Sequence, residues 1–522
     1  MSLRWDNTIR YNIAQRVDER NSKFGNSAVT DEGTYSFDNG DLVANRLDLL
    51  SELDFIYDRS MGFRLSYAYW YDNVYGDHSE TNPNRPFSAI PSYVNKEYSR
   101  YTKRYYHGPA GEWLDAFAFL NFDAGAVPVK LKAGRHAVFW GEALFLGGAL
   151  NGISYAQMPL DLQKGFATPG VEAKELFRPL NQVSGQAQLT DELSVAAQYF
   201  LEWESYRYPE GGTYLGPVDF AFDGPDRQFI PGLGFATRGE AVQPDQSGEY
   251  GFALRWSPEF LDGTLGFYYR HYSDKLPQTF LTRVGPNISR YNLIYADDID
   301  LYGISLAKNV GSISLGAELS YRHNTPLNSQ ILGISPTGLP DDGETPGPRG
   351  NTFHGLVNVL GLIGRTPVFD AATYAGELTW SHWDKVTKGE NLFSAEDYRG
   401  CTFAGREGDK WDGCSTKNFF GMGLAFTPTW YQVLPGVDLS MPLTYAVGLK
   451  GNAATVFGGN QGNGNYSVGL GADVFQKYRV DLKFISYVGH YNDNGTAVTT
   501  QNGFTTLLKD RDFVSLTFKT TF

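Results

Sequence analysis

Residues 511–522 read RDFVSLTFKTTF and alternate between two kinds of side chain. Mostly apolar residues occupy every second position, and polar residues occupy the positions between them. The first face holds Val514, Leu516, Phe518, Thr520 and Phe522, and the second holds Ser515, Thr517, Lys519 and Thr521. This alternation with a period of two predicts a β-strand that has one face in apolar surroundings and the other in polar surroundings.

The beginning of the chain carries the same pattern with a stronger contrast. In the segment 2–17, one face holds Leu3, Trp5, Ile9, Tyr11 and Ile13, and the other holds Arg4, Asp6, Thr8, Arg10 and Asn12. A soluble sheet would seldom place charged residues so regularly opposite an apolar face. In a membrane-spanning barrel the apolar side contacts lipid and the charged side faces the lumen. We therefore predict an all-β transmembrane antiparallel β-barrel.

About 18 such segments follow one another along the chain. They are 2–17, 44–58, 61–75, 112–123, 127–141, 182–190, 193–208, 247–257, 263–280, 291–308, 311–325, 352–365, 369–386, 416–431, 437–450, 464–476, 478–491 and 511–522. Long and short connections alternate between them. An even strand number with short periplasmic turns and long external loops is typical of single-chain bacterial barrels. We expect one barrel domain over residues 1–522, with both termini on the periplasmic side.

The composition agrees with a barrel and excludes a bundle of membrane helices. Aromatic residues make up 15 % of the 522 residues, yet the mean hydropathy is only −0.34. No apolar run approaches the roughly 20 residues that a transmembrane helix needs. The formal net charge of −14 argues against nucleic acid as a partner. No export signal precedes the first strand, so we expect a mature-length chain located in the bacterial outer membrane.

The final strand also resembles the C-terminal signal by which the barrel-assembly machinery recognises outer-membrane proteins. The signal is an alternating strand that ends on an aromatic residue, and here Phe518 and Phe522 supply the aromatic positions. We expect this machinery as a partner, together with membrane lipids and lipopolysaccharide.

The third long connection, residues 142–181, is the most apolar loop of the chain. We predict that it folds into the lumen, includes a short helix within 170–177, and narrows or plugs the channel. The apolar residues that we assign to this plug are Trp140, Phe145, Leu150, Tyr155, Met158, Phe166 and Phe177. So much apolar surface must pack somewhere, and the lumen is the nearest shelter; the alternative is a cap that packs on neighbouring loops outside it.

Charged residues bracket this loop: Arg135, Glu142, Glu172, Lys174, Glu175 and Arg178. One interpretation is an ion-pair latch that holds the loop inside the barrel. The other is ordinary pairing of lumen charges, which a packed interior requires in any case.

Two cysteines, Cys401 and Cys414, lie close together in one Gly-rich loop, which favours a disulfide in an exported protein. No Cys/His cluster has zinc spacing, and the sequence contains neither a Gly-x-Ser-x-Gly elbow in its required context nor a phosphate loop. The acidic clusters at 297–300 and 341–344 lack the spacing of a calcium loop and are interpreted as solvated surface. We predict no enzymatic activity and no cofactor.

Several motifs resemble a family of large Gram-negative outer-membrane proteins that is still described as a domain of unknown function. They are Gly134–Glu142, the Gly/Asn segment to Asn151, Pro159–Asp161, Glu172–Pro179 and the strand Leu193–Glu204. The resemblance implies trafficking of hydrophobic molecules, with a lipoprotein-carrier-like periplasmic protein and a resistance-nodulation-division transporter of the inner membrane as partners. His136 departs from the family, in which we expect a Gln or a similar polar residue.

Together these features predict an outer-membrane transporter for hydrophobic or amphipathic molecules such as lipids, sterols or hydrocarbons. The alternative in the same class is a diffusion porin for small polar solutes such as sugars or carboxylates. A barrel enzyme and a surface adhesin are the alternatives from other classes.

Overall fold

The computed structural model describes residues 1–76, 78–84, 90–167, 173–230, 234–284, 287–330, 333–334, 339, 343–403 and 405–522. Its main element is a closed antiparallel sheet of 19 strands in which neighbours in sequence are neighbours in space. The strands are β1 (Ser2–Arg16), β2 (Leu42–Tyr57), β3 (Met61–Asp72), β4 (Ala110–Ala124), β5 (Val127–His136), β6 (Leu180–Gln188), β7 (Leu193–Phe200), β10 (Tyr250–Trp256), β11 (Gly263–Tyr272), β14 (Ile299–Val310), β15 (Ile313–Pro326), β17 (Arg349–Ile363), β18 (Ala371–Lys388), β21 (Asn418–Leu434), β22 (Val437–Ser440), β23 (Leu443–Lys450), β24 (Gly464–Val474), β25 (Tyr478–Val488) and β28 (Phe513–Thr521).

The ring has 18 positions because β22 and β23 together occupy one of them. Both pair with β21 on one side and with β24 on the other, and Pro442 lies between them. Proline has no N–H to donate to a neighbouring strand, which interrupts the hydrogen-bond ladder there. The ring closes where β28 pairs with β1, with Phe518 opposite Tyr11. The predicted barrel of about 18 strands is confirmed.

The side chains are distributed inside out relative to a soluble protein. Leu3 and Trp5 on the outer face of β1 are 64 % and 66 % exposed, whereas Arg10 and Arg16 on its inner face are 2 % and 0 % exposed. Lipid replaces water around such an outer surface, and charges that face inward need partners in the lumen. The protein is therefore a bacterial outer-membrane β-barrel.

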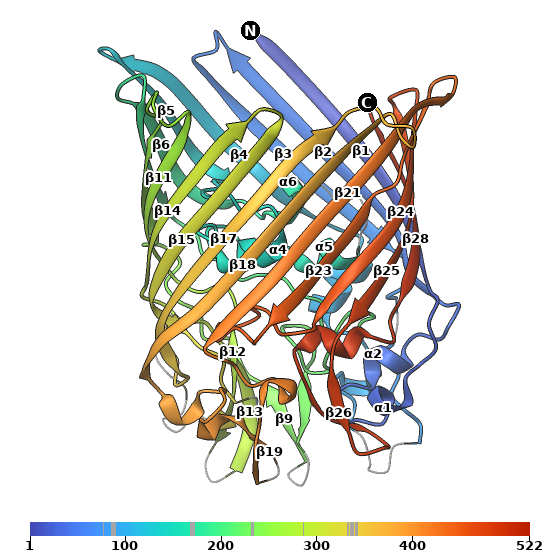
Figure 1. Ribbon diagram of the computed structural model, residues 1–522. Helices are drawn as coiled ribbons and strands as arrows, with labels where there is room; N and C mark the ends of the chain where they lie inside the picture. Colours follow the sequence, from blue (N-terminus) through green and yellow to red (C-terminus); the bar gives the residue numbers. More distant parts are fainter. Residues whose placement is uncertain are drawn as a thin grey trace.

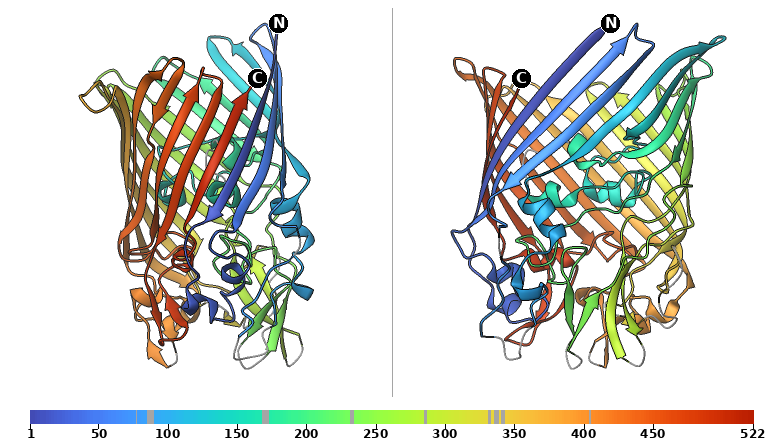
Figure 2. Two further views of the ribbon diagram at one scale, coloured as in Figure 1. Left: turned by 90° about the vertical axis from the view of Figure 1, so that its right-hand side faces the viewer. Right: turned by 180° about the vertical axis from the view of Figure 1, so that it is seen from behind.

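The two ends of the barrel differ (Figure 1). Both termini lie at the end with the short turns, as in the turn at Asp58 and Arg59, whose φ angles of 47° and 56° suit a tight hairpin. The long loops gather at the opposite, extracellular end, and the two further views show the same division (Figure 2). No helix among the described residues is long and apolar enough to cross a membrane.

The extracellular loops contain structure of their own. A five-stranded sheet consists of β8 (Arg227–Ile230), β9 (Gly234–Arg238), β12 (Gln278–Val284), β13 (Asn287–Ile294) and β16 (Gly333–Ile334), and two short hairpins consist of β19 (Thr402–Phe403) with β20 (Arg406–Glu407) and β26 (Tyr491–Asp493) with β27 (Val498–Gln501). The short helices here are α1 (Ser22–Gly25), α2 (Glu32–Tyr35), α3 (Arg100–Thr102), η1 (Val94–Lys96), η2 (Lys103–His107), η3 (Glu390–Leu392), η4 (Arg399–Cys401), η5 (Lys410–Asp412) and η6 (Phe504–Leu508).

This extracellular sheet corrects two predicted strands. The segments 263–280 and 291–308 were each expected to be a single wall strand, but β11 ends at Tyr272 and β12 begins at Gln278, outside the wall. Pro277 lies in the gap and cannot continue the hydrogen-bond ladder. Likewise β13 ends before β14 begins at Ile299. Alternation continues across both gaps, so the pattern alone does not reveal that the chain leaves the wall.

The wall is uneven in height. Strands β17, β18 and β21 span 15, 18 and 17 residues, whereas β6, β7 and β10 span 9, 8 and 7. The third connection enters the barrel on the side of these short strands.

Candidate functional site

Residues 137–179 connect β5 to β6 and are referred to here as the plug. The plug contains α4 (Leu146–Asn151), α5 (Leu162–Ala167) and α6 (Ala173–Leu176), and Figure 1 places them inside the ring of strands. Helix α4 contacts β17, β18 and β21, which lie on the opposite side of the ring from β5. The plug therefore crosses the lumen from one wall to the other.

Aromatic and aliphatic side chains form the core of the plug. Trp140, Leu150, Ile153, Tyr155 and Leu160 pack in one buried cluster with inward-facing residues of the wall, among them Tyr268 and Tyr272 of β11 and Ile299 and Leu301 of β14. Full burial of one large apolar side chain is worth about 1.5–3 kcal/mol. These inward-facing apolar side chains of β11 and β14 give the plug a complementary surface to pack against.

Two carboxylates of the far wall accept hydrogen bonds from the plug backbone. Glu318 on β15 accepts from the N–H of Ile153 at 2.7 Å and from that of Glu142. Glu377 on β18 accepts from the N–H groups of Leu144 at 2.8 Å and Phe145 at 3.3 Å. Among the described residues, neither carboxylate forms an ion pair with a cation. Backbone amides of the plug are therefore the main hydrogen-bond donors to both carboxyl groups.

Three glycines allow the plug backbone to reach these carboxylates. A Cβ at Gly148 would overlap the Glu377 carboxylate, and a Cβ at Gly141 or Gly152 would overlap that of Glu318. Gly141 also has φ +100°, a conformation that side-chain-bearing residues rarely adopt. Glycine is therefore required at these positions of the family motif, because a side chain there would collide with a carboxylate of the wall.

Two arginines of the wall complement the carboxylates by donating to plug carbonyl groups. Arg322 on β15 donates to the carbonyl oxygens of Leu150 at 3.2 Å and Gly152 at 3.0 Å. Arg270 on β11 donates to the carbonyl oxygen of Tyr155 at 2.6 Å. The Arg322 guanidinium also lies 4.1 Å from the centroid of the Tyr155 ring. Residues 141–156 are consequently held by wall acceptors and wall donors together.

Ion pairs hold the remainder of the plug to β1 and to the loop that follows β7. Glu175 of α6 accepts two hydrogen bonds from Arg10 of β1, at 2.8 and 3.0 Å, and both side chains are buried. Asp161 pairs with Arg207 at 3.1 Å. Arg178 pairs with Glu204. Breaking a buried pair from one side typically costs 3–5 kcal/mol, so these contacts fix the position of the plug strongly.

The apolar residues predicted from the sequence all lie in or beside the plug. Trp140, Leu150 and Tyr155 belong to its core, Phe166 packs against that core, and Met158 packs with Leu180 and Phe200. Phe145 contacts the wall at Gly423, and Phe177 meets Phe139 edge to face at 5.5 Å.

The predicted charged residues divide into three groups. Glu175 and Arg178 make the pairs described above, and Glu142 meets Ser305 through its side chain at 3.2 Å. Arg135 instead pairs with Glu202 and Glu204, at 2.6 and 2.7 Å. Glu172 and the side chain of Lys174 lie outside the described residues. No sequence pattern distinguishes Glu318, Glu377, Arg270 or Arg322, because any inward charge on a wall strand looks the same until its partner is known.

Other predicted positions are also located. His136 faces inward and is hydrogen-bonded to Ser184 at 2.7 Å. Phe518 and Phe522 face outward at the closure of the ring, 37 % and 63 % exposed.

Asp297, in the first acidic cluster, pairs with Arg349 at 3.0 Å, and no group of three candidate metal ligands occurs among the described residues. Asp341 and Asp342 lie outside the described residues.

Two cavities lie on opposite sides of the plug and share no lining residue. The periplasmic one has a volume of about 780 Å³ and is lined partly by Glu142, Leu144 and the short turn at Pro258. The extracellular one has a volume of about 440 Å³ and is lined by extracellular loops. The plug separates them.

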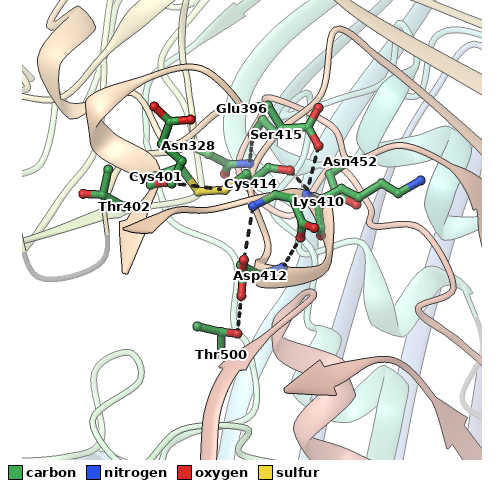
Figure 3. The surroundings of a disulfide bond; sticks show 12 residues. Asn328, Glu396, Cys401, Thr402, Lys410, Asp412, Cys414, Ser415, Asn452 and Thr500 are labelled. Atoms are coloured by element: carbon green, nitrogen blue, oxygen red, sulfur yellow. Dashed lines mark hydrogen bonds between the residues drawn. A yellow bond between two sulfur atoms is a disulfide. The ribbon is translucent and has the colours of Figure 1, made fainter. Parts of the chain in front are cut away.

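A disulfide braces the loops around the extracellular cavity (Figure 3). Cys401 and Cys414 are bonded and buried. Asn452 of a neighbouring loop donates to the carbonyl oxygens of Cys414 and Lys410, both at 2.8 Å. Asp412 accepts from Thr500 at 2.6 Å, which joins the disulfide loop to the β26–β27 hairpin.

A buried carboxyl pair lies in the loops that lead to this cavity. Glu32 of α2 accepts from the Ser92 hydroxyl at 2.6 Å, and Asp219 accepts from the N–H of Glu32 at 3.1 Å. Burial, together with the nearby Asp219, raises the pKa of Glu32 to about 8. Glu32 is therefore neutral in the folded loops at moderately acidic pH.

The chain belongs to the family described as "Protein of unknown function (DUF1302)", whose sequence profile matches residues 1–522. Among curated proteins no match is found.

The fold was also compared with solved structures. OpdK of Pseudomonas aeruginosa, in a structure with vanillate, is 11 % identical with a TM-score of 0.41, and the alignment covers 100 % of this chain and 98 % of that one. OccAB4 of Acinetobacter baumannii is 9 % identical with a TM-score of 0.43, covering 100 % and 99 %. The outer-membrane channel DcaP of Acinetobacter baumannii is 10 % identical with a TM-score of 0.38, covering 100 % and 97 %. The assignment of a closed barrel depends on the strand pairing and not on these similarities.

Replacement of both Glu318 and Glu377 by alanine should loosen the plug. It leaves plug amides without acceptors, and each unpaired buried donor costs about 1–3 kcal/mol. We expect a cysteine introduced at Leu150 to react with a soluble maleimide at least about tenfold faster in the folded double variant. The control replaces Asp473 and Asp481, lumen carboxylates that pair with Arg479 of the wall. Equal labelling rates in both backgrounds would contradict the anchoring role.

Glu32→Gln should remove a pH-dependent weakness of the extracellular loops. The pKa of Glu32 is raised by folding, so its contribution to stability is complete below about pH 4.3, the pKa of an unperturbed Glu, and is lost as the pH rises through 8. We expect hydrogen exchange in residues 24–36 to be slower in the variant than in the wild type at pH 9 and equal at pH 4. Slower exchange in the wild type at pH 9 would show that the sign is wrong.

Proposed function

We propose that this DUF1302 family member is an outer-membrane transporter for hydrophobic or amphipathic molecules, such as lipids, sterols or hydrocarbons, and that the plug closes its lumen at rest. The observation that carries the proposal is the apolar plug core, which spans the lumen between the two cavities. A polar solute that passes by diffusion needs a hydrated path. An apolar molecule can instead exchange contacts with aromatic and aliphatic side chains as the plug moves.

The plug contacts support a mobile closure. Its core packs on the wall at β11 and β14, while the anchors at Glu318 and Glu377 hold backbone amides and not a covalent or metal-bound group. Hydrogen bonds of this kind can be exchanged for others when a solute or a partner arrives. A periplasmic carrier and an inner-membrane transporter, which the family resemblance implies, would provide such a partner at the short turns.

One observation favours the alternative of a diffusion porin for sugars or carboxylates. The periplasmic cavity is lined by Glu142, Asp262, Lys308 and Asn358, which is a hydrophilic surface suited to polar solutes. The two functions predict different solutes for the intact protein: hydrophobic molecules for the transporter, and sugars or carboxylates for the porin.

The test measures both kinds of flux in porin-deficient Gram-negative cells. Uptake of the uncharged dye N-phenylnaphthylamine reports hydrophobic passage, and uptake of radiolabelled arabinose and gluconate reports polar passage. We expect the wild type to raise uptake of the dye but not of arabinose or gluconate. A variant with residues 143–177 replaced by a Gly/Ser linker should raise the uptake of the dye, arabinose and gluconate. A variant with a Gly/Ser linker at residues 494–497, a tip of the external hairpin, is the control and should behave as wild type.

Steady sugar or gluconate uptake through the wild type, without dye uptake, would overturn the proposal in favour of the porin.

A further inference from the structure

No plug residue lines the extracellular cavity of about 440 Å³, but Phe222 of its lining belongs to the same buried cluster as the plug core. Small-molecule sites in proteins commonly have volumes of about 300–1,000 Å³ and mainly apolar linings. Here large apolar side chains of the lining come from loops far apart in sequence, among them Val218, Phe220, Phe222, Phe403, Phe457 and Phe504.

A series of aromatic contacts connects this cavity to the plug. Phe504 lies 5.5 Å from Phe457, and Phe457 lies 4.7 Å from Tyr208, measured between ring centroids. Tyr208 belongs to the same buried cluster as Ile153 and Tyr155 of the plug. A flat apolar molecule that leaves the cavity would therefore meet aromatic surface at each step toward the lumen.

The lining of the cavity is unsuited to an anionic ligand, because it offers no cationic side chain among the described residues. Among the described lining residues the one charged side chain is Asp412, and it is already committed to Arg406 at 2.6 and 2.7 Å and to Thr500 at 2.6 Å. No Lys, Arg or His of the described chain lines the cavity. A carboxylate would lose its hydration and find no cation, whereas an uncharged molecule loses little.

One polar group of the lining has unused bonding capacity. The hydroxyl of Thr455 is buried and has no hydrogen-bond partner among the described residues. Unpartnered buried hydroxyls are uncommon in folded proteins, and a ligand oxygen would satisfy this one.

The surrounding loops are held in place before any ligand arrives. The disulfide Cys401–Cys414 closes one side, and Asn328 donates to the Ala453 carbonyl oxygen at 2.9 Å and to the Ser415 hydroxyl at 3.1 Å on another. Such preorganisation reduces the entropy that binding must overcome.

We propose that this cavity is the site from which the transported molecule enters, and that it takes an uncharged, mainly apolar or aromatic molecule bearing a hydroxyl or carbonyl group. This inference rests on the proposed function, because it names the substrate class and the side of the membrane from which uptake begins.

The test uses three probes that share a pyrene ring: 1-pyrenebutanol, 1-butylpyrene and 1-pyrenebutyrate. Saturable binding is measured by fluorescence on full-length protein in lipid nanodiscs, and the signal of protein-free nanodiscs is subtracted to remove partition into lipid. Val456→Trp, which fills the cavity, should abolish this binding. We expect pyrenebutanol to bind at least about tenfold more tightly than pyrenebutyrate. Val94→Trp, in an exposed extracellular loop outside the cavity lining, is the matched control and should bind as wild type.

Thr455→Val provides an independent measurement if the larger substitution prevents folding. It keeps the shape of the side chain and removes the hydroxyl, so we expect pyrenebutanol binding to weaken about fivefold while butylpyrene binding stays unchanged. Equal binding of pyrenebutyrate and pyrenebutanol, or pyrenebutanol binding that neither Val456→Trp nor Thr455→Val alters, would overturn the inference.

Different experimental results would contradict the inferred binding site and the proposed transport function. Cavity binding without dye uptake in cells would contradict transport and leave the site intact. Dye uptake that Val456→Trp leaves unchanged would contradict the cavity as the starting point and leave transport intact.

Discussion

An irregular stretch of backbone inside a barrel must find a hydrogen-bond partner for every buried N–H and C=O group, and here side chains of the wall supply many of them. Strands satisfy their own backbone groups by pairing with neighbours, but residues 141–156 pair with no strand. An unpaired buried amide is costly. Glu318 and Glu377 provide acceptors, and Arg322 and Arg270 provide donors, at positions where the plug needs them.

This arrangement links the plug to the wall as a unit. Glu318 joins the amides of Glu142 and Ile153, and Glu377 binds the adjacent amides of Leu144 and Phe145. A shift of the plug backbone would therefore break several bonds together. The glycines at 141, 148 and 152 make the close approach possible, and the apolar core on the side of β11 and β14 supplies packing. The position of the plug is thereby defined by many contacts that act together.

The fold could be predicted closely from the sequence, because lipid outside and water inside impose a different residue type on alternate positions of every wall strand. The inward folding of the third loop followed from its apolar composition, since side chains such as Leu150 and Tyr155 need shelter. The anchors could not be predicted. Glu318 and Glu377 look like ordinary lumen residues along their strands, and only the three-dimensional path of the plug pairs them with Ile153 and Leu144. The extracellular sheet was missed for a related reason, because β11 and β12 continue one alternation although the chain leaves the wall between them.

Transport as proposed requires that the plug move away from the far wall before anything passes. An engineered disulfide can tie the plug to the far wall. A Cβ at Gly423 of β21 would lie 2.7 Å from Cγ of the Phe145 ring. Phe145→Cys with Gly423→Cys therefore places two thiols side by side. Dye uptake would be recorded in cells with this pair oxidised and then reduced, with the wild type under the same reductant as control. We predict that uptake stops in the oxidised form and returns on reduction. Equal uptake by the oxidised and reduced forms would show that the plug need not leave the far wall.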